Sequence, residues 1–200
     1  DFETLGTAEA DLTVLDSTFD NLFSNSVNVV NQGTGTLEVT IAESEFTNTG
    51  AGAINIVQSN SGTTRFDIHD NPTFLRGSNN GVSHAININQ TAGAPAGSVL
   101  EGAISNNVIG DASSSTSATT GGDGTRVFST GAATTTVQID GNDIQGVGGN
   151  GINVQMSGSA NPAHTMNVTM FDNTVTTSDI NSFDAIRLIA GAATGNRGVL

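Results

Sequence analysis

The chain has 200 residues, with five basic residues against 19 acidic ones, so its formal net charge is −14 and its pI is about 4.1. All five basic residues are arginines, and such an acidic chain repels polyanions, so we expect no nucleic-acid partner. The absence of cysteine excludes disulfides and thiolate metal sites. The apolar runs are too short for a membrane span, so we expect no membrane insertion.

Six short segments repeat along the chain. Each has an alternating apolar pair, a serine or asparagine three residues after the second apolar residue, and another apolar residue soon after. In chain order they are 12–19 (LTVLDSTF), 39–46 (VTIAESEF), 66–74 (FDIHDNPTF), 102–109 (GAISNNVI), 137–144 (VQIDGNDI) and 168–175 (VTMFDNTV). The third segment has an extra residue near Pro72, and the fourth has Gly102 in place of its first apolar residue. Alternation with a period of two predicts short β-strands.

A second alternating apolar pair follows in most of these repeats. Its members, together with the second apolar residue of each first pair, form the core that we predict. This core consists of Val14, Ile41, Ile54, Ile56, Ile68, Ile86, Ile88, Ile104, Ile139, Ile152, Val154, Met170, Ile186 and Leu188. One strand and one corner cannot bury an apolar face alone, but stacked copies form parallel ladders around a continuous core.

The sequence therefore predicts an all-β parallel β-helix of about six coils, with residues 1–200 as a single domain. An antiparallel β-sandwich is the alternative, because it also has many short strands separated by turn residues. The repeat pattern resembles the right-handed parallel β-helix of the pectin-lyase-like superfamily, and within it the repeat regions of bacterial adhesins and autotransporter passengers. This resemblance extends from about Leu12 to Leu188 and implies a right-handed solenoid.

The serine or asparagine of each repeat is expected at one corner of the coil. These residues are Ser17, Ser44, Asn71, Asn107, Asn142 and Asn173. Side-chain amides stacked in successive coils can hydrogen-bond to one another, and asparagine tolerates the left-handed backbone of a tight turn. We interpret this column as a structural ladder and not as a ligand site.

We predict no catalytic residue for this structural β-helix. The alternative is a carbohydrate-active β-helix enzyme, either a polysaccharide lyase or a hydrolase. Glycosidases generally need two carboxylates beside the scissile bond, and Asp172, Asp179 and Asp184 are the nearest group in sequence. The sequence that includes Asp184, FDAIRL, only distantly resembles a polygalacturonase strand. The paired aspartates, the His-Gly and the Arg-x-Lys of the polygalacturonase pattern are absent from the chain.

No cofactor and no metal site are predicted. Calcium is the ion that would suit the chain best, because carboxylates, amides and backbone carbonyls can supply its six to eight oxygen ligands. Asp111, Asp140 and Asp143 lie at expected turns, but no acidic loop motif joins them. We therefore interpret them as solubilising surface residues.

We expect a secreted or surface-displayed structural rod, such as an adhesin stalk, an extracellular matrix component or a filament subunit. A phage tail-fibre or tailspike segment is a further alternative. Val199 and Leu200 fall where another coil would begin, so the chain is expected to be a segment of a longer repeat protein. Unpaired strands at the ends of a solenoid need cover, so the expected partners are further coils or other copies, and surface glycans. The expected location is extracellular, or the bacterial cell surface.

Overall fold

The computed structural model describes residues 1–76, 84–91, 94–111, 113, 116–130, 132–157, 164–176 and 184–191. Within these residues the regular structure is entirely β, and every strand pair in the three sheets is parallel. The antiparallel sandwich is therefore wrong, and the chain is a parallel β-solenoid. The described residues include no helix of the length and apolarity that a membrane crossing requires.

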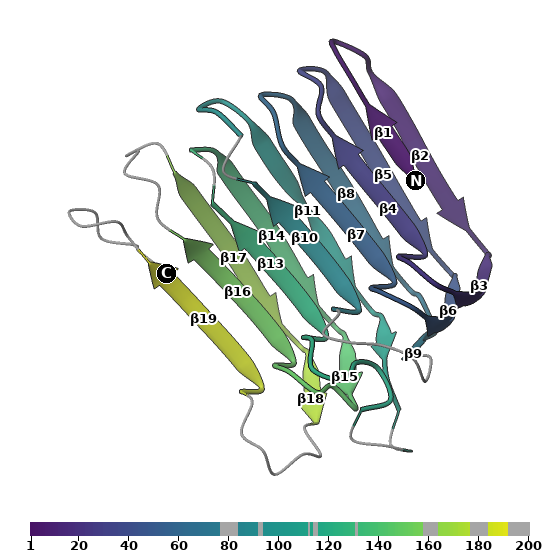
Figure 1. Cartoon of the computed structure of the whole chain (residues 1–200). Coiled ribbons are helices and arrows are strands. Elements are labelled where there is room, and N and C mark those ends of the chain that lie inside the picture. The colour runs from purple at the N-terminus through teal and green to yellow at the C-terminus, as the bar shows by residue number, and fades with distance from the viewer. Residues whose placement is uncertain are drawn as a thin grey trace.

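Each sheet is a stack of strands that come from successive coils (Figure 1). Sheet A is β1 (Phe2–Thr4), β4 (Val27–Asn31), β7 (Ile54–Gln58), β10 (Ile86–Gln90), β13 (Thr125–Ser129), β16 (Ile152–Ser157) and β19 (Ile186–Gly191). Sheet B is β2 (Ala10–Leu15), β5 (Thr36–Ala42), β8 (Thr63–His69), β11 (Val99–Ser105), β14 (Thr134–Asp140) and β17 (Thr165–Phe171). Sheet C is β3 (Thr18–Leu22), β6 (Glu45–Thr49), β9 (Thr73–Arg76), β12 (Val108–Ile109), β15 (Asp143–Gln145) and β18 (Thr174–Thr176).

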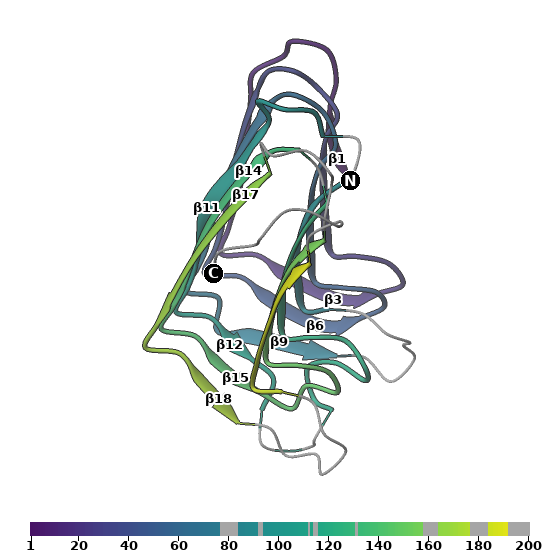
Figure 2. The same cartoon turned by 90° about the vertical axis from the view of Figure 1, so that its left-hand side faces the viewer.

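Each coil runs from sheet B to sheet C and then to sheet A before the next coil begins (Figure 2). Figure 2 shows the three sheets as three walls around a common interior. The solenoid has about 5 turns, and not about six as the sequence suggested. Each of the six repeat segments contains the end of one sheet B strand, the corner that follows it and the start of the next sheet C strand.

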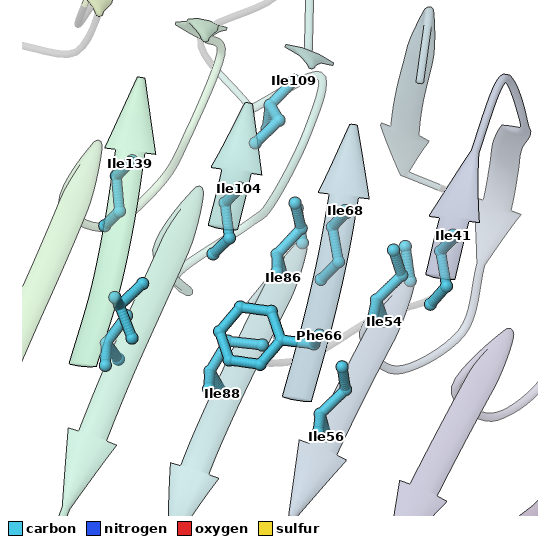
Figure 3. Packing of buried hydrophobic residues seen from close by; sticks show 14 of the residues in the cluster. Ile41, Ile54, Ile56, Phe66, Ile68, Ile86, Ile88, Ile104, Ile109 and Ile139 are labelled. Carbon is cyan, nitrogen blue, oxygen red and sulfur yellow. The ribbon is translucent and has the colours of Figure 1, made fainter. Parts of the chain in front are cut away.

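The core consists of columns of apolar side chains in register between coils. Ile41, Ile68, Ile104 and Ile139 are successive register partners in sheet B, and each is 0% exposed. Figure 3 shows these isoleucines pointing into the same interior as Ile54, Ile56, Ile86 and Ile88 of sheet A. The sheet A isoleucines, together with Ile152 and Val154, are also fully buried. Because successive side chains of a strand point to opposite faces, only every second residue of each strand points into the core.

Four predicted core residues lie at the ends of the stack and are less buried. Val14 and Met170, on the two edge strands of sheet B, are partly buried against the core. Ile186 and Leu188 are 46% and 44% exposed, so their placement in the buried core was wrong. They extend the columns of Ile152 and Val154, but β19 ends sheet A and no described strand stacks on its other side.

The corner region of the third repeat accommodates its extra residue without displacing the core. Pro72 lies between the corner residue Asn71 and β9, and the pairing of β6 with β9 contains a register shift. Phe46 and Phe74 nevertheless remain register partners, with ring centroids 4.8 Å apart. Phe19 extends this stack, 5.1 Å from Phe46. The insertion is therefore absorbed as an irregularity in sheet C.

Gly102 lacks a side chain because the ring of Phe66 occupies the space beside it. Phe66 and Val137, its register partners in β8 and β14, face the core and are buried. A Cβ atom added at Gly102 would lie 2.6 Å from Cγ of Phe66 and 2.0 Å from its backbone oxygen. Glycine in place of an apolar residue in the fourth repeat thus leaves room for the ring of Phe66 in the adjacent coil.

Replacing Gly102 with alanine is expected to lower the free energy of unfolding by about 2 kcal/mol, because over-packing forces neighbouring atoms to move. The measurement is the urea midpoint of the variant against that of the unaltered chain. Ala103→Ser changes the next residue, whose side chain faces outward, and is expected to stay within about 0.5 kcal/mol of the unaltered chain. Equal stability of Gly102→Ala and the unaltered chain would show that the packing around Phe66 is loose.

Candidate functional site

The predicted corner residues form a continuous hydrogen-bonded column between sheets B and C. The backbone N–H groups of Ser44, Asn71, Asn107 and Asn142 each donate to the Oδ1 atom of the asparagine in the next coil, at 3.0 to 3.2 Å. The Nδ2 atoms of Asn71, Asn107, Asn142 and Asn173 each donate to a backbone oxygen of the preceding coil. The Ser17 N–H begins the column by donating to Oγ of Ser44, 3.2 Å away. Each inner asparagine thus joins three coils.

The residue before each corner residue has a left-handed backbone. Its φ values are 47° to 63° in all six repeats, at Asp16, Glu43, Asp70, Asn106, Gly141 and Asp172. Asp, Asn and Gly are the residues that tolerate this conformation best. Sequence analysis associated the left-handed backbone with the corner asparagines, and this was wrong, because the left-handed residue precedes them. The preference for Asp, Asn and Gly at the preceding position was the signal that could have identified it.

A second column lies at the corner before sheet A, two residues ahead of each strand. Its members are Asn25, Gly52, His84, Asp123, Asn150 and Asp184. Side-chain atoms of Asn25, Asp123 and Asn150 accept the backbone N–H of the residue in the next coil, at 2.9 to 3.1 Å. His84 contributes Nδ1, which lies 2.9 Å from the backbone N of Asp123. Sequence analysis missed this column because its members share no single residue type.

Asp123 is a buried carboxylate at the centre of this second column, and it is only 4% exposed. Its Oδ2 atom lies 3.2 Å from Nδ1 of His84 and accepts from Nδ2 of Asn153 at 2.9 Å. Its Oδ1 atom accepts from the backbone N and Nδ2 of Asn150, at 2.9 and 2.7 Å. Burial would raise the pKa of Asp123, but the contact with His84 and the hydrogen bonds from Asn153 and Asn150 lower it to about 2. Asp123 therefore remains ionised inside the corner.

Arg126 lies over the Phe128 ring beside this carboxylate, with its guanidinium carbon 4.4 Å from the ring centroid. Its Nη1 atom is 3.5 Å from Nε2 of His84. Burial lowers the pKa of Arg126, and the charge of Asp123 partly offsets that effect. The cluster of His84, Asp123 and Arg126 thus places opposite charges together at one corner.

The Asp123 carboxylate is expected to make the fold acid-labile. A pKa depressed from 3.8 to about 2 stabilises the folded state above about pH 4. This contribution, about 2 kcal/mol, is lost as the pH falls from about 4 towards 2. The check is the urea midpoint between pH 6 and pH 2.5, where Asp123→Asn should lose less stability on acidification than the unaltered chain. Asp11→Asn, which removes an exposed carboxylate, is the control, and parallel losses in all three proteins would contradict the prediction.

A third polar row lies inside the solenoid, where the strands of sheet A end and those of sheet B begin. Its buried members are Thr4, Asn31, Gln58, Thr64, Gln90, Ser98, Ser129 and Thr135. Asn31 accepts from Thr4 Oγ1 at 2.9 Å and donates to Thr64 Oγ1 at 3.0 Å. The Thr64 hydroxyl also donates to Oε1 of Gln58. Sequence analysis missed this row, because it placed only apolar residues in the interior.

An open groove of about 530 Å³ crosses the outer face of sheet B. It is lined by Glu38, Val39, Thr40, Arg65, Phe66, Asp67, Glu101, Gly102, Ala103, Thr136, Val137, Gln138 and Thr169. Within it, Arg65 bridges two carboxylates, with Nη1 3.0 Å from Glu38 Oε1 and Nε 2.6 Å from Glu101 Oε1. These hydrogen bonds raise the pKa of Arg65. The groove thus offers carboxylate, hydroxyl and amide groups along the solenoid axis.

The alternative catalytic aspartates lie at different corners of the coil. Asp172 follows β17 at the corner before sheet C, whereas Asp184 precedes β19 at the corner before sheet A. The Asp184 backbone N–H donates to Oδ1 of Asn150 at 3.1 Å, which gives Asp184 a place in the second column. Asp179 lies outside the described residues, as do Val199 and Leu200.

The three candidate calcium ligands each accept a hydrogen bond from a nearby residue of the same strand or turn. Asp111 accepts from the backbone N of Ser113 at 2.8 Å, and Asp140 accepts from Nε2 of Gln138 at 3.0 Å. Asp143 accepts from Nε2 of Gln145 at 3.2 Å. In the described part of the chain, no group of three or more His, Asp or Glu residues is placed to hold a metal ion.

Comparison with known proteins found no match for this chain. No protein-family model matches the chain, and no curated protein and no solved structure is significantly similar to it.

Proposed function

We propose that the chain is a structural rod, secreted or displayed on a bacterial surface, as part of an adhesin stalk, an extracellular matrix or a filament. The observation that supports this proposal best is that apolar side chains of the last described coil are exposed, whereas the equivalent side chains of the inner coils are buried. Ile186 and Leu188 are 46% and 44% exposed, whereas their register partners Ile152 and Val154 are 0% exposed. Exposed apolar columns and unpaired strand edges favour addition of another coil.

The hydrogen-bonded columns support the same proposal because they are directional. In the first column each backbone N–H uses an acceptor in the next coil, and Asn173 is its last described member. In the second column Asp184 occupies the corresponding last place and accepts no described N–H from a further coil. A following coil, either from a longer chain or from another copy, would continue both columns head to tail.

Sedimentation of the 200-residue chain over a range of concentrations tests this proposal. We expect concentration-dependent association into elongated species, because the outermost described strands of each sheet have no described strand on one side, and another copy can pair with such an edge. The double substitution Ile186→Glu and Leu188→Glu places charges on the exposed columns and is expected to abolish association. Glu43→Gln, at an exposed corner position between inner coils, is the control. A chain that remains monomeric at every concentration would contradict growth from the open ends.

A carbohydrate-binding role is the second candidate, and the groove on sheet B favours it. The groove carries carboxylates, hydroxyls and an amide on a surface whose floor includes the small residues Gly102 and Ala103. Titration with a panel of neutral and amine-bearing oligosaccharides, followed by calorimetry, tests this role. Ala103→Trp should block binding, whereas Thr13→Trp, outside the groove on the same sheet, should not. Equal affinity in both variants, or no binding by the unaltered chain, would exclude it.

A further inference from the structure

Five polar side chains meet at one end of the interior polar row. They are Gln90 at the end of β10, Ser98 before β11, Ser129 at the end of β13, Thr135 in β14 and His164 before β17. The first four are 0% exposed. Gln90 and Ser129 are register partners on adjacent strands of sheet A, so two residues 39 apart in sequence are held side by side.

The geometry of this cluster is that of an activated hydroxyl beside an amide. Ser129 Oγ lies 2.7 Å from Nε2 of His164 and 2.8 Å from Oε1 of Gln90. Thr135 Oγ1 donates to the same Gln90 Oε1 at 2.7 Å. Gln90 Nε2 lies 3.4 Å from Oγ of Ser98. Because Oε1 is bonded to Cδ at about 1.2 Å, the serine Oγ lies no more than about 4 Å from the carbonyl carbon of the glutamine side chain.

We propose that Ser129 and Gln90 join in an intramolecular ester bond that the folded chain forms by itself. Ser129 Oγ attacks Cδ of Gln90, so that the Oγ–Cδ bond forms and the Cδ–Nε2 bond breaks. The hydroxyl proton passes to Nε2 of His164 and from there to the departing nitrogen, which leaves as ammonia. The products are the ester and one ammonia molecule, and the reaction needs no oxidant, metal or water.

Each neighbouring group has a role in this reaction that its position supports. His164 is the general base, because its Nε2 atom contacts the nucleophile. Burial lowers the pKa of His164, which keeps the imidazole neutral and able to accept a proton. The Thr135 hydroxyl stabilises the negative charge that develops on Oε1 in the tetrahedral intermediate. Since Thr135 alone can satisfy Oε1, the Ser129 hydroxyl is free to donate to His164.

The fold supplies two further advantages. Holding the two reacting groups on paired strands replaces a bimolecular encounter with an intramolecular one of high effective concentration. Complete burial of Gln90 and Ser129 excludes the bulk water that would hydrolyse the ester. In a rod, such a bond would link two successive coils covalently and would limit their separation under tension.

The neighbouring pair Gln58 and Thr64 provides an internal comparison. Its hydroxyl also donates to the glutamine Oε1 atom, and both residues are 0% exposed. Among the described residues, however, no imidazole is hydrogen-bonded to Thr64. The proposal therefore assigns the ester to the Gln90–Ser129 pair and expects Gln58 and Thr64 to remain unlinked.

Intact-mass spectrometry of the purified, denatured 200-residue chain tests the proposal. We expect a mass lower than that of the sequence by one ammonia, and fragmentation that links a peptide containing Gln90 to one containing Ser129. Ser129→Ala should restore the full mass, whereas Thr64→Val should keep the loss. His164→Gln should slow the appearance of the linked form at least tenfold after refolding.

Two results would overturn the proposal. One is a mass equal to that of the sequence in the folded, unaltered chain, a result that does not depend on whether any variant folds. The other is an ammonia loss that persists in Ser129→Ala, because a succinimide formed at an asparagine would lose the same mass without using the serine. Failure of the chain to associate end to end would leave this result unaffected, since the ester lies within one chain.

Discussion

Replacing Ile88 with alanine is expected to lower the free energy of unfolding by about 3 to 4 kcal/mol. Ile88 is 0% exposed and lies in the centre of a core column of sheet A. Removing its methyl and methylene groups both loses burial of apolar surface and leaves a cavity, because neighbouring strands fixed by ladder hydrogen bonds cannot collapse fully. Equilibrium unfolding in urea, monitored by circular dichroism, measures the change.

Leu188→Ala is the matched control, since Leu188 belongs to the same column but lies in the last described coil and is 44% exposed. Its loss should be about 1 kcal/mol, because less apolar surface is withdrawn from water there. The unfolding measurement belongs at a low protein concentration, where end-to-end association is suppressed. A loss at Leu188 as large as that at Ile88 would mean that the end coil is covered in solution.

Replacing Asn107 with alanine is expected to lower the free energy of unfolding by about 3 kcal/mol. Its side chain accepts from the N and Nδ2 atoms of Asn71 and donates to the backbone oxygen of Ile68 and to Oδ1 of Asn142. Alanine would remove the partner of the Asn71 backbone N–H, of one hydrogen of the Asn71 Nδ2 group and of the Ile68 oxygen in a buried corner, and each unsatisfied group costs about 1 to 3 kcal/mol. Urea unfolding provides the measurement.

Two further substitutions in the same column separate hydrogen bonding from packing. Asn107→Ser keeps an acceptor for the Asn71 N–H, as Ser44 does for Ser17, so its loss should be smaller than that of alanine. Ser17→Ala, at the end of the column, removes a hydroxyl whose one bond among the described residues is to the backbone oxygen of Leu15, and should cost less than about 1 kcal/mol. Equal losses at Ser17 and Asn107 would show that the ladder bonds contribute little to stability.

The sequence by itself determined the strands, the solenoid and the first corner column. Alternation of apolar and polar residues acts locally, since successive side chains of a strand point to opposite faces. Ile41, Ile68, Ile104 and Ile139 could therefore be assigned to the core from spacing alone. The recurrence of serine or asparagine three residues later was visible for the same reason, because each repeat carries that residue at a fixed distance from its own strand.

Only the tertiary structure decided which distant polar groups meet. The partners that join different coils in the second corner column and in the interior polar row are 27 to 45 residues apart, and their pairing depends on how loops of unequal length restore the register. Asp123, His84 and Asn150 share a position but not a residue type, so no repeat pattern marks them. Gln90, Ser129 and His164 come from three different coils. They are in contact only because parallel stacking places the corner of each coil directly on the corresponding corner of the preceding coil.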